Sequence, residues 1–236
     1  MNERKGLILD FGGVLTTPLL TSVTEFERDE GLSRGSVVRQ LSSDHEVLRL
    51  TEDLERGSVT QAQWNEVAAL RIGVSPGNLL GRIFSGLRPE PLMYEAAAAA
   101  RRQGIRVGLL SNSVGRDPWD LYADCDLATT FDAVLTSEDH GLRKPEPAIY
   151  EHMLKMLELP AAACAFVDDS PHNLPQLPQW AWLRSMPRSH GRRSPKFRTC
   201  SASTCFPDAV RPSWPVGDRA GPLSVVGPFV AVPSPV

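Results

Sequence analysis

The sequence predicts an α/β protein with a doubly wound parallel (Rossmann-like) sheet and an inserted helical cap. Three observations lead to this prediction. Short, continuous apolar runs end in polar residues, as is typical of strands that are buried on both faces of a sheet. Helical patterns lie between the later runs, and a long all-helical stretch separates the first run from the second. A chain of 236 residues is also long enough to bury a substantial core.

Four apolar runs predict the strands. Each run is too short for a helix of ordinary length, and each ends in a carboxylate or a hydroxyl residue. The predicted strands are GLILD at 6–10, IRVGLLSNS at 105–113, AVLTS at 133–137 and CAFVDD at 164–169.

Two helices are predicted between the later strands. The stretch 89–104 begins with prolines, is rich in alanine and ends in basic residues followed by glycine. The stretch 144–160 carries apolar residues near helical spacing and stops at Pro160. Together with the strands, these helices predict a core of residues 1–15 and 89–174.

The stretch 16–88 breaks the alternation of strands and helices, and we expect it to form a helical cap over the end of the sheet. Its glycines and serines separate four amphipathic segments. These segments are SVTEFERDEG, SSDHEVLRLTEDLERG, TQAQWNEVAALRIG and SPGNLLGRIFSG. Polar and aromatic residues in the cap could face a site, but packing and solvation are the simpler expectation for Glu25, Arg28, Trp64 and Arg82.

Polar residues at the carboxyl ends of the predicted strands form the candidate site, because ligands bind at that edge of open α/β sheets. They are Asp10 after the first strand, Ser111 and Asn112 after the second, and Asp168 and Asp169 after the last. Carboxylates gathered this closely require a cation, and hard oxygen ligands select Mg²⁺.

Lys144 lies in the loop before the last predicted helix, where it can join this group. A carboxylate nucleophile, a hydroxyl, a lysine and an acidic pair suit the handling of phosphate. Lys144 and Mg²⁺ would offset charge on a phosphoryl group while Asp10 attacks in line.

The order and spacing of four motifs resemble the haloacid dehalogenase superfamily, which is rich in phosphatases that use an aspartyl-phosphate intermediate. The resemblance covers residues 1 to about 174, and the helical insert matches the subfamily that has a helical cap between the first two motifs. The motifs read LILDFGGVLTT, VGLLSNS, GLRKPEPAIY and AFVDDSPHN.

The resemblance implies a role for each matching residue. Asp10 would be the nucleophile and a Mg²⁺ ligand, Ser111 and Asn112 would contact the phosphoryl group, and Lys144 would neutralise its charge. The remaining expected metal ligands are Asp168, Asp169 and the backbone carbonyl of Gly12, with Asn173 orienting the loop; His172 is expected at the surface.

Gly12 departs from the family pattern. Phosphatases of this family typically have a second aspartate there, which protonates the leaving group and later activates water. Loss of a general acid/base costs roughly 10²–10⁴-fold in rate. We therefore expect a phosphatase of a small phosphomonoester with low or substrate-restricted activity. Two alternatives stay open: a 2-haloacid dehalogenase, which also lacks the second aspartate but needs no metal, and a non-catalytic or degraded relative.

The composition changes abruptly at residue 175. The stretch 175–236 holds 11 of the 20 prolines and carries a charge of +6, against −9 for the rest of the chain. It shows no helical or strand period, so the edge strand and final helix that the family pattern requires are expected to be missing. That loss would leave the strand carrying Asp168 unpaired on one side and lower stability.

Two hypotheses account for this composition: a genuine proline-rich extension, and a shifted reading frame, which also recovers the pattern that the family requires. If codons 176–186 are read one base out of step, Trp180 followed by Ala181 must give glycine, and G- or C-rich codons elsewhere give an alanine helix before it and a strand after it. We therefore hypothesise that residues 175–236 are out-of-frame translation; sequencing of independent isolates tests this, and an intact frame in all of them excludes it.

The overall composition limits the partners. A net charge of −3 offers no reason to expect nucleic acid, and no apolar stretch reaches the 18 residues of a membrane span. The four cysteines fit no zinc site, because only Cys200 and Cys205 are close and no histidine follows them, and they are expected to be free thiols. We expect a cytoplasmic protein that acts on a small phosphorylated molecule, in an oligomeric state that the sequence leaves open.

Overall fold

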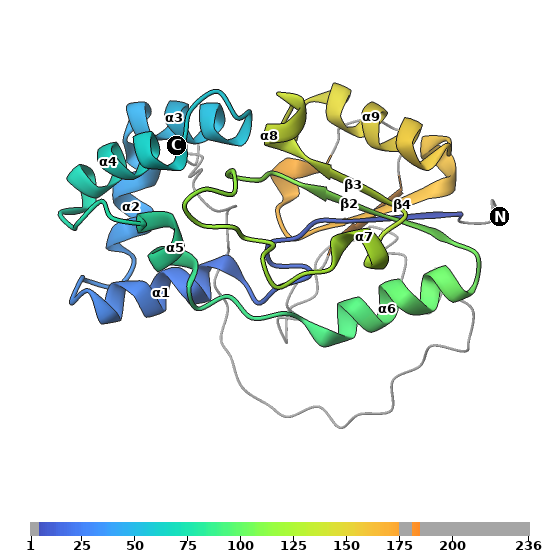
Figure 1. The fold of residues 1–236 in the computed structure, drawn as a ribbon, viewed down its shortest axis with the longest axis horizontal. Coiled ribbons are helices and arrows are strands. Elements are labelled where there is room, and N and C mark those ends of the chain that lie inside the picture. The colour runs from blue at the N-terminus through green and yellow to red at the C-terminus, as the bar shows by residue number, and fades with distance from the viewer. Residues whose placement is uncertain (1–4, 175–180, 185–236) are drawn as a thin grey trace, which may run out of the picture.

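The computed structural model describes residues 5–174 and 181–184, which form a five-stranded parallel sheet flanked by helices (Figure 1). The strand order is β3-β2-β1-β4-β5, so the first strand lies at the centre. This arrangement confirms the predicted α/β class and all four predicted strands. The strands are β1 (Gly6–Leu9), β2 (Arg106–Ser111), β3 (Ala133–Thr136), β4 (Cys164–Asp168) and β5 (Ala181–Arg184).

Helices cover the two faces of the sheet. Leu7 and Leu9 belong to a core cluster with α6 (Pro91–Arg102), whereas Ile8 belongs to a second cluster with α9 (Pro147–Leu157). Successive side chains of a strand point to opposite faces, so β1 contributes to both clusters and is buried throughout. Both long helices were predicted; the shorter elements are α7 (Leu127–Thr130), α8 (Ser137–His140) and the 3₁₀ turns Ala161–Ala163 and Pro171–Asn173.

A separate group of helices lies beyond one end of the sheet (Figure 1). We call α1–α5 the helical group; it has a hydrophobic cluster of its own, which includes the fully buried Trp64, Leu41 and Leu80. None of the described helices combines the length and the apolar composition that crossing a membrane requires. The helical group consists of α1 (Leu19–Asp29), α2 (Ser36–Ser43), α3 (His45–Glu55), α4 (Gln61–Ile72) and α5 (Leu79–Phe84).

The sequence predicted four helices here and missed α2. This helix is short, and its start is stabilised from another helix: the Glu27 carboxylate of α1 accepts hydrogen bonds from Gly35 N at 2.6 Å and Val37 N at 2.8 Å. Acceptors at a helix start satisfy N–H groups that have no partner within the helix. Because the capping carboxylate belongs to a neighbouring helix, no capping residue next to α2 in the sequence indicates where this helix starts.

Two crossing segments join the helical group to the sheet. Thr16 and Pro89 form an antiparallel bridge, and Thr17 N donates to Arg88 O at 2.8 Å. The chain thus leaves the sheet layer and returns to it at adjacent points. This pairing supports the division into a core of 1–15 and 89–174 and a cap of 16–88, which we retain as a proposal.

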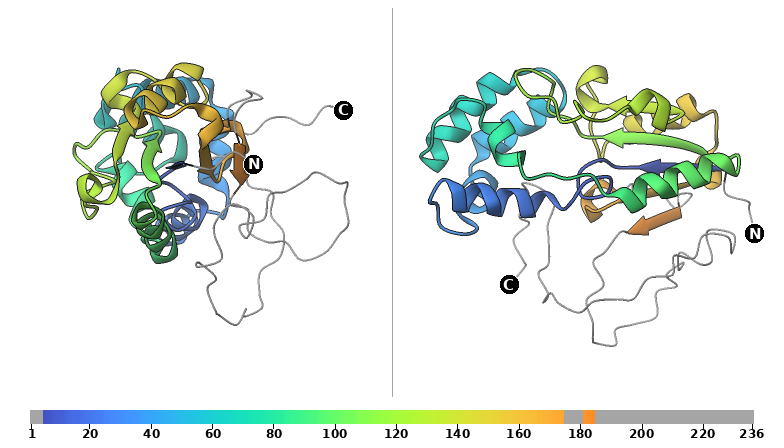
Figure 2. Two further views of the ribbon diagram at one scale, coloured as in Figure 1. Left: turned by 90° about the vertical axis from the view of Figure 1, so that its right-hand side faces the viewer. Right: turned by 60° about the horizontal axis from the view of Figure 1, so that its bottom comes forward.

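The predicted absence of the edge strand was wrong. Residues 181–184 pair in parallel with β4, from Ala165 opposite Ala181 to Asp168 opposite Arg184, and β5 lies at the sheet edge in Figure 2. Strand pairing uses backbone groups alone, and this short run contains no proline, so it can satisfy the edge despite its atypical composition. The predicted final helix and the rest of 175–236 lie outside the described residues.

We predict that β5 contributes measurably to stability. A chain ending at residue 174 should unfold at a temperature about 4–8 °C below that of a chain ending at residue 190, because four ladder pairs are worth about 2 kcal/mol together. Thermal unfolding followed by circular dichroism measures the difference. Equal midpoints for the two chains would show that β4 does not need this neighbour.

Candidate active site

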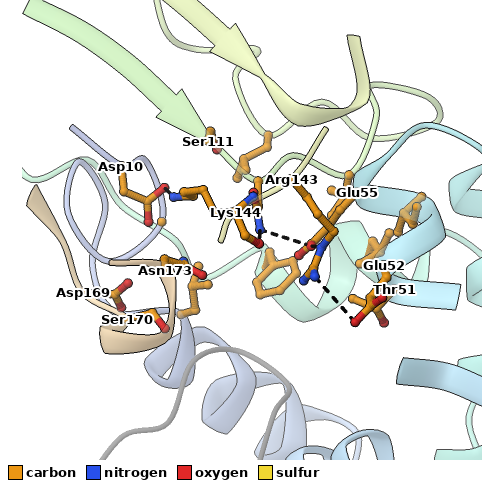
Figure 3. Close-up of a pocket in the computed structure, with 18 of the residues that line it drawn as sticks. Asp10, Thr51, Glu52, Glu55, Ser111, Arg143, Lys144, Asp169, Ser170 and Asn173 are labelled. Atoms are coloured by element: carbon orange, nitrogen blue, oxygen red, sulfur yellow. Dashed lines mark hydrogen bonds and ion pairs between the residues drawn. The ribbon is translucent and has the colours of Figure 1, made fainter. Parts of the chain in front are cut away.

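The centre of the site is a buried lysine held between two carboxylates. Lys144 Nζ donates hydrogen bonds of 2.7 Å to Asp10 Oδ1 and of 2.7 Å to Asp168 Oδ2. Lys144 is 1% exposed, and the two aspartates follow or end adjacent central strands. Figure 3 shows Asp10 and Lys144 pointing toward one another. The structure therefore brings together three residues that the sequence singled out.

The acidic residues of the site repel one another. Burial raises the pKa of Asp10 to about 8, with the charge of Asp168 adding to the effect and Lys144 opposing it. Burial and the same neighbour raise the pKa of Asp169 to about 6. The two carboxylates in turn raise the pKa of Lys144 against the opposing effect of burial, so the lysine stays charged. A further cation would relieve this repulsion.

Asp10, Asp168 and Asp169 can supply oxygens to one metal ion. Each offers a carboxylate oxygen, and these oxygens all lie within 4.8 Å of one another. Hard oxygen donors at this spacing fit Mg²⁺, which is commonly held by one or two carboxylates together with water and substrate oxygens. The donor set thus fits the metal that the sequence implied.

Gly13 makes room for one of these carboxylates. Its φ is +73°, and a Cβ built on it would lie only 2.3 Å from Asp169 Oδ2. Any side chain at this position would displace Asp169 as well as strain the backbone. Sequence reasoning missed Gly13; the paired glycines after Asp10 were the available signal.

Ser111 receives its orientation from Tyr122. The Tyr122 hydroxyl donates to Ser111 Oγ at 2.8 Å, and burial raises the tyrosine pKa, which keeps the proton on this donor. Since a hydroxyl group has one proton of its own to donate, Ser111 can direct that proton toward a ligand. Tyr122 was not predicted, because it lies in an irregular loop with no motif around it.

Asn112 holds the backbone of Lys144. Its Oδ1 accepts from Lys144 N at 2.8 Å, and its Nδ2 donates to Lys144 O at 3.2 Å. The same Nδ2 lies 3.2 Å from Glu55 Oε2. This geometry positions the lysine, and the phosphate contact that the sequence suggested for Asn112 stays a prediction.

The loop after β4 fixes Asp168. Its Oδ1 accepts from Ser170 N at 2.8 Å and from Asn173 Nδ2 at 3.2 Å, while Tyr150 donates to the Asn173 carbonyl. Asn173 is therefore placed where it can orient the loop. His172 is exposed.

Gly12 lies beside Asp10 in the cavity wall, where the family pattern has its second aspartate. A Cβ at Gly12 would lie 3.1 Å from Leu19 Cδ2 and 3.2 Å from Leu19 Cδ1. The end of the Leu19 side chain thus fills the space toward which a side chain would extend.

The helical group reaches the site through Glu55, at the end of α3. Arg143 Nε donates to Glu55 Oε2 at 2.6 Å, and Arg143 Nη1 lies 3.5 Å from Glu52 Oε1 (Figure 3). Burial raises the pKa of Glu55, and Arg143 opposes this. Neither residue was predicted; Arg143 adjoins Lys144, but no sequence pattern connects it with Glu55.

A cavity of about 270 Å³ opens between the acidic cluster and the helical group. It is lined by Asp10, Ser111 and Lys144 at one end and by mostly apolar residues of the helical group elsewhere. Trp64 belongs to this lining, as well as to the core of the group. Arg82 is paired with Glu30 and lies over Phe26, as expected for a packing residue.

The fold and the site together define a hydrolase of the haloacid dehalogenase type. The family model described as haloacid dehalogenase-like hydrolase matches residues 4–177. The chain belongs to this family, and it is a hydrolase.

Curated relatives include several phosphatases. A sesquiterpene phosphatase of Aspergillus oryzae is 28% identical over 179 residues, which is 72% of this chain and 83% of the relative. A glyceraldehyde 3-phosphate phosphatase of Methanocaldococcus jannaschii is 28% identical over 83 residues, which is only 35% of this chain and 36% of the relative. The shorter match covers about a third of each protein.

Solved structures share the fold. A point mutant of a family enzyme of Bacteroides thetaiotaomicron, solved with magnesium and inorganic phosphate, has a TM-score of 0.56 at 21% identity; the match covers 72% of this chain and 87% of that enzyme. An L-2-haloacid dehalogenase of Xanthobacter autotrophicus with covalently bound chloropropionic acid has a TM-score of 0.52 at 20% identity. The match covers 72% of this chain and 71% of the dehalogenase. Both likenesses concern the fold alone.

We predict that Gly13→Ala weakens Mg²⁺ binding about 10- to 100-fold, as is typical when a ligand loses its support. Calorimetric titration with Mg²⁺ measures this without any substrate. Gly104→Ala is the matched control, because Gly104 has φ +77° but nothing lies within 4 Å of its Cβ position. Equal Mg²⁺ affinity in the two variants would contradict the role of Gly13.

Proposed function

We propose that this hydrolase is a Mg²⁺-dependent phosphatase that cleaves a phosphomonoester through an aspartyl-phosphate intermediate. The observation that carries the proposal is the buried Lys144 between Asp10 and Asp168, with Asp169 close enough to complete a metal site. Such a site has the charges needed to hold a dianionic phosphoryl group beside a carboxylate nucleophile.

Asp10 is the proposed nucleophile. Its carboxylate oxygen forms a bond to phosphorus, the phosphorus–oxygen bond to the alcohol breaks, and the departing oxygen takes a proton from water. Water then attacks phosphorus in the acyl phosphate and gives its proton to the hydroxide left by the first step. The bond between phosphorus and Asp10 breaks, which regenerates the carboxylate and releases inorganic phosphate. Lys144 favours the ionised form of Asp10 against the effect of burial and holds its carboxylate in place, because its ammonium group is hydrogen-bonded to Asp10 Oδ1.

The other site residues bind and orient. The Ser111 hydroxyl donates a hydrogen bond to a phosphoryl oxygen, and the hydrogen bond from Tyr122 fixes the orientation of that hydroxyl. Asn173 and Ser170 hold Asp168. The proposed Mg²⁺ ligands are Asp10, Asp168, Asp169 and the backbone carbonyl of Gly12, and a bound metal would supply positive charge that offsets the negative charge of the phosphoryl oxygens.

Relatives support the reaction class. The two phosphatases described above are named for different substrates, a sesquiterpene and glyceraldehyde 3-phosphate. They therefore favour phosphate ester hydrolysis without defining the alcohol part of the substrate.

A 2-haloacid dehalogenase is the second candidate, because Gly12 leaves the chain without the second aspartate and dehalogenase structures share the fold. That reaction needs no metal, whereas this chain gathers three carboxylates in one place. The third candidate, a non-catalytic relative, is disfavoured because Asp10, Ser111, Lys144 and Asp169 all line one cavity.

Assays with and without Mg²⁺ distinguish the candidates. We expect phosphate release from phosphomonoesters that stops on chelation of Mg²⁺ and is abolished in Asp10→Asn, which retains the size of the side chain but loses the nucleophile. Halide release from 2-haloacids that persists in the presence of a chelator would instead establish the dehalogenase. If wild type and Asp10→Asn are equally inactive in both assays, the chain is non-catalytic.

We predict that Gly12→Asp raises the phosphatase rate, and that Gly12→Asp combined with Leu19→Ala raises it further. The added carboxyl restores a general acid/base worth roughly 10²-fold or more, and the smaller side chain at 19 gives it room. Steady-state kcat measures the gain. Gly12→Asn with Leu19→Ala is the control, since an amide of the same size cannot transfer the proton; a gain there would refute the acid/base explanation.

A further inference from the structure

We propose that the alcohol part of the substrate is a hydrocarbon chain, which enters the apolar part of the cavity while the phosphate binds at Asp10 and Lys144. This inference rests on the phosphatase function proposed above and concerns the same cavity. The cavity has one charged end, and the helical group and the loop after β2 form most of its remaining wall.

Apolar side chains dominate the wall beyond the acidic cluster. They come from four separate segments, α3, α4, the region of α5 and the loop after β2, so the apolar character surrounds the space from several sides. The residues that define this apolar chamber are Leu48, Trp64, Phe84, Leu87, Trp119 and Leu121.

Thr51 and Trp64, which lie in the part of the wall formed by α3 and α4, have their polar side-chain atoms hydrogen-bonded within the helical group. Thr51 Oγ1 donates to Val47 O at 2.8 Å and accepts from Trp64 Nε1 at 2.9 Å. Both partners thus have their hydrogen bonds within the helical group. A sugar or another polyhydroxylated alcohol would lose hydrogen bonds to water here without equivalent replacements, which is unfavourable.

The charged residues at the side of the cavity are likewise paired. Arg143 lies against Glu55 and Glu52, with its side chain 14% exposed and that of Glu55 11% exposed. Because the guanidinium already faces two carboxylates, a second anionic group on the substrate would compete with an existing ion pair. The site is therefore suited to one phosphate and an uncharged chain.

Gln61 holds the loop that completes the chamber. Its Nε2 donates to Gly115 O at 3.1 Å and Trp119 O at 2.7 Å, and Trp119 N donates back to Gln61 Oε1 at 3.3 Å. Trp119 stacks on Phe84 with ring centroids 5.8 Å apart. The indole is thus fixed against the helical group, so that the chamber exists before a chain enters it.

A series of n-alkyl phosphates from ethyl to decyl tests the inference, with glycerol phosphate as the polar comparison. We expect kcat/KM to rise about fourfold per added methylene until the chamber is filled, which corresponds to about 0.8 kcal/mol for each buried methylene. The rise should come mainly through KM, because the chain contacts lie away from the reacting atoms.

Substitutions in the wall of the apolar chamber test whether the chain-length dependence of kcat/KM arises there. Trp119→Ala and Leu48→Asn should each lower the ratio of kcat/KM for octyl over ethyl phosphate by about 10-fold or more, since both side chains are half-buried in the wall. Leu70→Asn is the matched control, because Leu70 is 74% exposed on the same helical group. A ratio that falls equally in the control would contradict the assignment.

The outcomes separate this inference from the proposed function. Equal kcat/KM for ethyl and octyl phosphate, or a preference for glycerol phosphate, overturns the hydrocarbon chain and leaves the phosphatase standing. If no ester is hydrolysed, the phosphatase fails, and calorimetry with ethyl and octyl phosphonate decides the chamber by itself. Tighter octyl binding that Trp119→Ala removes supports it, and equal affinities overturn it.

Discussion

The placement of Lys144 between Asp10 and Asp168 is the constraint on which the site depends. A buried charge is costly unless its partners and their remaining hydrogen-bonding positions are satisfied. Here Asp168 is held further by the loop after β4, and Asn112 holds the lysine backbone on both sides. Three segments distant in the chain must therefore meet in one arrangement, and the order of the parallel strands brings their carboxyl ends together.

Adjacent glycines have opposite consequences in this arrangement. Gly13 is required by geometry, because its missing Cβ makes room for Asp169. Gly12 instead removes a proton-transfer group, and the end of Leu19 lies where that side chain would extend. The two glycines after β1 thus have opposite effects: Gly13 supports the proposed metal site, and Gly12 limits the proposed acid/base chemistry.

Much of the fold could be predicted because it follows from local patterns. Apolar runs identified β1 to β4, and proline starts with glycine or proline stops identified α6 and α9. The site residues followed from the rule that strand ends converge. The failures share a different cause: α2 is capped by Glu27 from another helix, β5 forms through backbone pairing that composition does not reveal, and the Arg143–Glu55 contact joins two separate layers.

The sequence by itself determined the α/β class, the helical insert and the residues available for chemistry, because periodicity and residue type are properties of neighbours in the chain. Only the tertiary structure decided which groups touch. In the folded chain Lys144 contacts two carboxylates, and Tyr122 donates a hydrogen bond to Ser111. β5 pairs with the second edge of β4, and an apolar chamber lies beside the acidic cluster. These contacts depend on the packing of distant segments, in which each side chain must satisfy burial and hydrogen bonding together.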